Sequence, residues 1–206
     1  MDKNQRPNHP LIPPHGGYRN LKSYQTAETV YDAAVIFCDR FIDKRSRTHD
    51  QMVQAARSGV QNIAEGSMAS ATSKKTELKL IGVARASLEE LLLDFQAFLR
   101  QRGLRVWSKD SPEALAVRKK YLPGKSDTSD PSDRSDRSGR SEKSLTDPYG
   151  IATASPEVAA NTLICLINQA GYLLGRQLKT LEEQFIAEGG FTERLYKFRT
   201  QARKAR

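Results

Sequence analysis

The chain has 206 residues, which is enough for one well-packed domain with room for further segments. Its 33 basic and 24 acidic residues give a net charge of +9, which favours contact with a polyanion. The start of the chain lacks the apolar core of a secretion signal, and no run of about 18 apolar residues occurs, so we expect a cytoplasmic protein with no membrane contact.

The first 45 residues divide into a lead-in and a helix. Proline and glycine crowd residues 1–17, so we expect a flexible lead-in there. From Tyr18 to about Arg45, apolar side chains recur at alternating steps of three and four, which places them on one face of a first helix.

The second helix carries its own start and stop signals. Thr48 and Gln51 have the spacing of a capping box, in which two otherwise unpaired backbone N–H groups are satisfied. Gly66 predicts the end of the helix. Gly59 lies between them and costs roughly 1 kcal/mol against alanine, so we expect a neighbouring helix to approach closely there.

A long third helix and a short fourth one follow. The apolar pattern predicts a helix from about Lys74 to Arg102, ended by Gly103, and we assign residues 18–105 to the first three helices of a bundle. In the connector 106–122, Ser111-Pro112-Glu113 combines a cap, a first-turn proline and an acid, which predicts a short helix.

Residues 123–154 have the composition of a disordered linker. Serine recurs at every third position from Ser126 to Ser144, and no apolar residue interrupts that stretch. Alternating arginine and aspartate suggest an RNA-binding tract as the alternative. Because residues 123–150 carry five basic and six acidic groups, a net of −1, a plain insertion is favoured.

The last long helix is predicted at residues 155–188. Ser155-Pro156-Glu157 repeats the cap, proline and acid signature, and an unbroken heptad seam then runs from Ala160 to Phe185. Such a seam is typical of a helix packed against near-parallel neighbours. We therefore expect an all-α fold, an antiparallel up-and-down four-helix bundle with an insertion before its fourth helix.

The basic segment 189–206 is the main functional candidate. Its last sixteen residues carry six basic and one acidic group, a net of +5. We expect the cations of this suffix helix to contact phosphate groups, together with basic residues of the second and third helices. The predicted nucleic-acid-binding residues are Arg194, Lys197, Arg199, Arg203, Lys204, Arg206, Arg57, Lys74 and Lys75. Two alternatives stay open: docking on a protein surface, and a solvated helix end whose cations suit the dipole.

A polar motif on the second and third helices has two interpretations. Asn62 and Glu65 lie near the apolar stripe of one helix, and Ser87 and Glu90 lie on the next. In the first interpretation these residues contact a ligand or partner. In the second they form structural hydrogen bonds, for instance to Arg57 or Arg85. The structural interpretation is favoured because buried polar groups are usually satisfied in this way.

No catalytic or metal site is predicted, and no cofactor is expected. The three histidines lie outside the helix cores, and no Glu-x-x-His pair exists for a di-metal centre. Without a histidine beside a serine or cysteine, nucleophilic catalysis lacks its base. Cys38 and Cys165 are interpreted as reduced buried thiols, with a disulfide or a reactive thiol as the alternative.

Two segments carry a resemblance to a known family. Residues 51–66, QMVQAARSGVQNIAEG, and residues 84–91, ARASLEEL, resemble the bacterial four-helix bundle family. That family includes proteins encoded in rRNA intervening sequences and the accessory variability proteins of diversity-generating retroelements. The similarity covers roughly residues 18–105, and the tail GGFTERLYKFR resembles the C-terminal suffix of one branch.

The resemblance implies a basic bundle that often assembles into a pentamer. In the retroelement members it also implies binding to nucleic acid and to a reverse transcriptase. Val53 and Gln54 stand where the family often has a basic pair, so no activity of that pair is carried over. We therefore expect a non-enzymatic, oligomeric protein that binds RNA or DNA. The alternative is a protein-interaction scaffold whose basic tail docks on a partner or a neighbouring subunit.

Overall fold

The protein is all-helical in the part that the computed structural model describes, which comprises residues 12, 15–121 and 147–204. Helices make up 79% of those residues, and no strand occurs among them. The long helices are α1 (Lys22–Phe41), α2 (Arg47–Ala69), α3 (Lys74–Gln101) and α5 (Pro156–Glu188). The shorter elements are η1 (Tyr18–Asn20), α4 (Pro112–Tyr121) and α6 (Phe191–Lys204).

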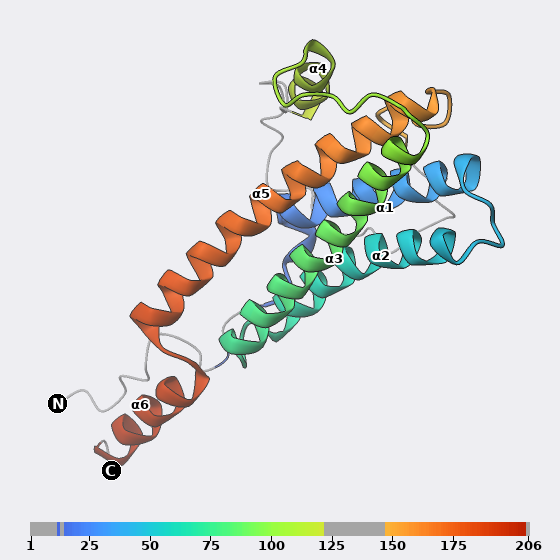
Figure 1. Ribbon diagram of the computed structural model, residues 1–206. Coiled ribbons are helices and arrows are strands. Elements are labelled where there is room, and N and C mark those ends of the chain that lie inside the picture. Colours follow the sequence, from blue (N-terminus) through green and yellow to red (C-terminus); the bar gives the residue numbers. More distant parts are fainter. Residues whose placement is uncertain (1–11, 13–14, 122–146, 205–206) are drawn as a thin grey trace, which may run out of the picture.

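The four long helices pack around one apolar core (Figure 1). α2 packs against α1 and α3, and α5 packs against the same two helices. At the centre, the ring of Phe37 meets those of Phe95 and Phe98 edge-on, at centroid distances of 4.9 and 4.8 Å. Because Phe37 is fully buried, truncating it to alanine would cost about 3–5 kcal/mol.

The predicted close approach at Gly59 is confirmed. A Cβ atom there would lie 2.8 Å from Cδ2 of Leu88, so α2 and α3 meet with no room for a side chain. This contact explains why a residue with poor helix propensity lies in the middle of α2.

The ends of α1 and α2 differ from the sequence prediction. α1 ends at Phe41, four residues early, because the backbone of Ile42 is extended. The N-cap of α2 is Ser46, whose Oγ accepts a hydrogen bond from the Thr48 backbone N–H at 3.2 Å, so the capping box predicted at Thr48 is wrong. Gly66 does not end α2, which continues to Ala69.

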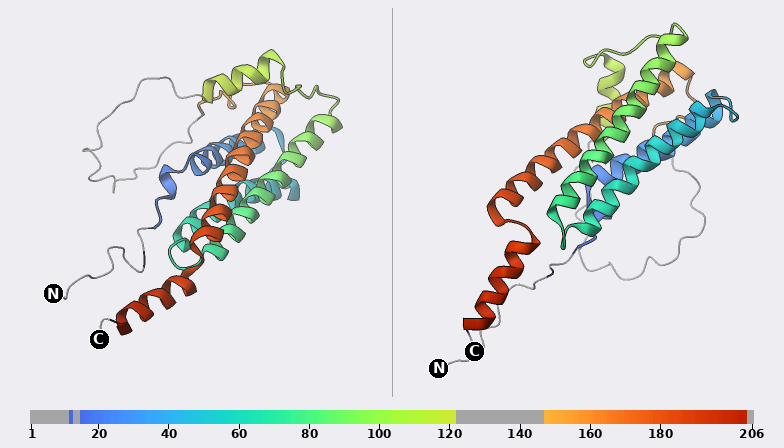
Figure 2. Two further views of the ribbon diagram at one scale, coloured as in Figure 1. Left: turned by 90° about the vertical axis from the view of Figure 1, so that its left-hand side faces the viewer. Right: turned by 60° about the horizontal axis from the view of Figure 1, so that its bottom comes forward.

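The predicted start of α5 is confirmed, and its seam is shorter than predicted. Ser155 Oγ accepts a hydrogen bond from the Val158 N–H at 3.3 Å, and Pro156 begins the helix. The buried seam stops at Leu181, because Phe185, the last residue of the predicted seam, is 36% exposed. The C-terminal end of α5 is set apart from α3, as the right-hand view in Figure 2 shows.

The prediction of a disordered linker at 123–154 is wrong for residues 147–154, which are ordered. Residues 122–146 lie outside the described residues. The carboxylate of Asp147 accepts hydrogen bonds from the backbone of Ile151 and Ala152, at 2.7 and 2.8 Å, and Ile151 is fully buried. The linker composition hid this turn because few apolar residues anchor it: Ile151 is buried, and Tyr149 and Ala154 pack against the core beside it. Of the predicted lead-in, residues 1–11 and 13–14 also lie outside the described part.

Candidate nucleic-acid interface

α6 is a separate helix because the chain breaks after α5. Gly189 adopts φ +74°, a conformation that strongly favours glycine, and its N–H donates to the Phe185 carbonyl at 3.0 Å. Glu193 accepts a hydrogen bond from the Gly190 N–H at 2.9 Å, which is half of a capping box. Both views in Figure 2 place α6 beyond the C-terminal end of α5.

Arg194 connects α6 to the rest of the protein. Its Nη2 donates to the carbonyl of Ala71, in the turn between α2 and α3, at 2.9 Å. Its Nε is buried and has no hydrogen-bond partner among the described residues. Because this hydrogen bond uses only one of the five N–H groups of the guanidinium, phosphate contact by Arg194 stays a prediction.

The opposite face of α6 carries the exposed cations. Lys197, Arg199 and Arg203 are all exposed, whereas Phe191, Leu195 and Phe198 on the other face are half-buried. None of those three cations forms an ion pair with a residue that the structure describes. Lys204 ends α6, and Arg206 lies outside the described range.

Tyr196 was not predicted as a site residue, and it adds an exposed aromatic ring to this face. Its side chain is 73% exposed, and it lies three residues before Arg199 and seven before Arg203, so all three share one flank of the helix. An aromatic ring beside arginines supports base stacking as well as phosphate contact. The only sequence signal was a tyrosine within the basic tail.

The cations predicted on α2 and α3 differ in their availability. Lys74 forms a salt bridge with Glu77 at 2.9 Å, and both side chains are largely buried, so Lys74 is neutralised. Lys75 is exposed in the first turn of α3, close in sequence to the Ala71 turn that holds α6. Arg57 is exposed in the middle of α2.

Among the residues that the structure describes, the polar motif forms none of the cross-helix hydrogen bonds suggested for it. The side-chain amide of Asn62 donates to the Ser58 carbonyl of its own helix at 2.8 Å, and Glu65 is exposed. Ser87 is half-buried, and Glu90 is exposed. Burial, and then the charge of Glu90, raise the pKa of Asp94.

A basic groove between α3 and α5 was missed entirely. Its volume is about 470 Å³, and its lining combines four residues of α3 with seven of α5. The cations that line it are Arg85, Arg176 and Lys179, and Tyr172 and Gly171 lie among them. No local pattern could have predicted it, because Arg85 and Arg176 are far apart in the sequence.

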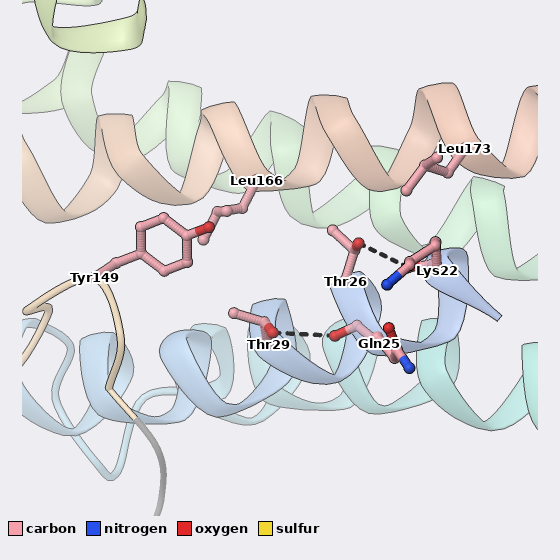
Figure 3. A pocket seen from close by; sticks show the side chains of 7 residues that line it. All are labelled: Lys22, Gln25, Thr26, Thr29, Tyr149, Leu166 and Leu173. Carbon is pink, nitrogen blue, oxygen red and sulfur yellow. Dashed lines mark hydrogen bonds between the residues drawn. The ribbon is translucent and has the colours of Figure 1, made fainter. Parts of the chain in front are cut away.

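A second groove, between α1 and α5, is mostly apolar (Figure 3). Leu166 and Leu173 contribute apolar side chains to it, and Tyr149 lies at one end. The hydroxyls of Thr26 and Thr29 donate to carbonyls of their own helix, at 2.7 and 3.0 Å. These hydroxyls support α1 and give the groove little polar chemistry.

The described residues offer few reactive groups. Burial raises the pKa of Cys38 to about 12, and it also raises that of Cys165, so both thiols stay protonated near neutral pH. Within the described ranges, no cluster of three metal-ligating side chains occurs. By length and composition alone, the stretch Pro156–Arg203 could cross a membrane, but 56% of its most apolar window is buried and a core helix passes the same test.

No protein-family model, no curated protein and no solved structure matches this chain.

Proposed function

We propose that this protein is a non-enzymatic nucleic-acid-binding protein that contacts RNA or DNA through the exposed face of α6. The observation that carries the proposal is the set of cations on that face, which have no ion-pair partner among the described residues and which surround Tyr196. Cations that are not neutralised within the chain are free to replace the counterions of a phosphate backbone.

The proposal includes the finer architecture that the sequence predicts. Four long helices packed each on two neighbours are compatible with an antiparallel up-and-down four-helix bundle of the resembled family. That resemblance adds a homo-oligomer, a pentamer, and a reverse transcriptase as a protein partner, and the sequence composition adds a cytoplasmic location. Light scattering of the full chain tests the assembly, and a monomer at micromolar concentration would contradict it.

Fluorescence anisotropy with labelled RNA and DNA tests the binding surface. The variant Lys197→Gln, Arg199→Gln, Arg203→Gln removes three exposed charges and leaves the Arg194 tether in place. We expect its log–log salt dependence to become shallower by about 2–3, because each phosphate contact contributes about 0.7–0.9 to the slope.

The matched control also removes three exposed cations, at Arg45, Arg100 and Lys109. It lowers the net charge by the same amount but lies away from α6. We expect its salt slope to stay near that of the wild type. Equal losses in both variants would mean that net charge alone drives binding, and no binding at low salt would end the proposal.

A protein-interaction role is the second candidate, favoured by the apolar surface beside α6. Ile186 is 77% exposed at the end of α5, and Phe185 beside it is also exposed. Such adjacent apolar side chains are a feature of protein contact sites. If Ile186→Ser abolishes capture of a partner from nuclease-treated extract while nucleic-acid affinity is unchanged, this role replaces the first.

A further inference from the structure

The groove between α3 and α5 has the features of a second ligand site, separate from α6. Its volume of about 470 Å³ lies in the usual range for ligand sites, about 300–1,000 Å³. Glu89 is the one acidic residue in its lining, against the cations Arg85, Arg176 and Lys179. None of these cations forms an ion pair within the described part of the chain.

Two glycines on α5 keep the groove open. A Cβ atom built at Gly171 would meet no atom within 4 Å, and one at Gly175 would meet only Nη1 of Arg85, at 4.0 Å. Arg85 therefore reaches from α3 across to the backbone of α5. Arg176 and Lys179 come from α5 itself, so positive charge is supplied by both helices.

Tyr172 distinguishes this groove from a simple basic patch. Its side chain lines the groove and is nevertheless 65% exposed, so the ring is accessible from solvent. An accessible aromatic ring beside arginine and lysine is the arrangement with which proteins bind single strands, where bases stack on the ring and cations contact the phosphates. A duplex keeps its bases paired inside and would use only the charges.

We propose that the α3–α5 groove binds single-stranded nucleic acid, with a base stacked on Tyr172 and phosphates held by Arg85, Arg176 and Lys179. The site is distinct from the α6 surface, because the exposed acids Glu182 and Glu183 follow Lys179 on α5 before α6 begins. The inference therefore goes beyond the proposed function. An experiment can exclude binding in the groove without excluding binding at α6, and the reverse also holds.

Three variants of the full chain test the groove with a labelled 12-nucleotide oligo-dT and a 12-base-pair hairpin. Tyr172→Ala removes the stacking ring, and we expect about 5- to 100-fold weaker binding of oligo-dT with hairpin affinity little changed. Gly171→Leu fills the groove without altering charge and should weaken oligo-dT binding as well. Gly171→Ala, whose added methyl group enters open space, is its matched control and should bind like the wild type.

Photocross-linking of a 4-thiothymidine oligomer locates the contact directly. We expect cross-links in the tryptic peptide 144–176, which contains Tyr172, and these should persist in the α6 variant Lys197→Gln, Arg199→Gln, Arg203→Gln. Cross-links confined to peptide 195–197, which contains Tyr196, would overturn the groove and leave the proposed function standing.

Two further outcomes would also overturn the inference. If thymidine monophosphate competes as well as the oligomer per molecule, the groove is a free-nucleotide site. If Gly171→Leu changes the mass measured by light scattering while oligo-dT affinity is unchanged, the groove is a contact between copies of this chain. Wild-type affinity in both Tyr172→Ala and Gly171→Leu would exclude a strand in the groove.

Discussion

α3 faces a glycine on each of two neighbouring helices, and the two glycines have opposite surroundings. On α2, a Cβ atom at Gly59 would lie 2.8 Å from the buried side chain of Leu88. On α5, a Cβ atom at Gly171 would meet nothing within 4 Å, although Gly171 and Leu88 both line the α3–α5 groove. The first glycine brings two helices together, and the second leaves a hollow between two helices.

The difference has a physical consequence for the interpretation of small residues. A glycine inside a helix costs roughly 1 kcal/mol relative to alanine, so each needs a compensating benefit. At Gly59 the benefit is the dispersion energy of close packing. At Gly171 no packing benefit exists in the described structure, which is why we look for a ligand there.

The largest expected effect comes from placing leucine at each position. Gly59→Leu forces a four-carbon side chain against Leu88, and we expect a loss of about 3 kcal/mol in the free energy of unfolding. Gly171→Leu enters open space, and we expect a change within about 1 kcal/mol. Urea unfolding followed by circular dichroism at 222 nm measures both.

A double variant sharpens this result. Leu88→Ala removes the side chain that Gly59→Leu would meet, so the two changes together should cost less than the sum of each alone. Strict additivity would mean that the loss arises elsewhere, and a severe loss in Gly171→Leu would mean that the groove closes in solution.

The sequence predicted the helices well because their burial depends on periodicity. The seam of α5 and the stripe of α1 require only that apolar residues recur at steps of three and four. Likewise, the approach of a helix to Gly59 was predictable because the cost of a mid-helix glycine needs compensation. The capping residue of α2 was not, because Ser46 and Thr48 are both good caps and the end of α1 decides between them.

The candidate sites depend on contacts between distant residues, and these have no local signal. Arg194 looks like a member of a basic cluster, yet its partner is a backbone carbonyl 123 residues away. Arg85 looks like an ordinary surface residue until α5 brings Arg176 and Lys179 beside it. A net charge of +5 could identify the tail, but it could not tell which of its cations are already used.

Alanine at the same two positions should change the stability less than leucine does, and the two changes should have opposite signs. Gly171→Ala should raise the free energy of unfolding by up to about 1 kcal/mol, because it gains helix propensity without meeting another atom. Gly59→Ala gains the same propensity but crowds Leu88, so we expect a net loss of about 1 kcal/mol. Equal shifts in the two urea midpoints would remove the contrast between the two sides of α3.

The smallest expected effect concerns Asp94 on α3. It lines a cavity together with Ser46, the N-cap of α2, and Met52 of α2. Burial, and then Glu90, raise the pKa of its carboxyl group in the folded protein. The folded state therefore binds the proton more tightly than the unfolded state. As the pH rises from the pKa of Asp94 in the unfolded chain through its raised pKa in the folded protein, the contribution of Asp94 to stability falls.

Asp94→Asn should consequently raise the free energy of unfolding at pH 7, by under about 0.5 kcal/mol because solvent screens a half-exposed charge. The gain should vanish below about pH 4, where aspartate is protonated in the unfolded chain as well. A gain that persists at pH 3 would mean that it does not arise from the charge of Asp94. A free energy of unfolding that falls at pH 7 would show that the carboxylate forms a favourable contact in this cavity. In that case the α2 side of α3 would be held by a polar interaction as well as by the packing at Gly59.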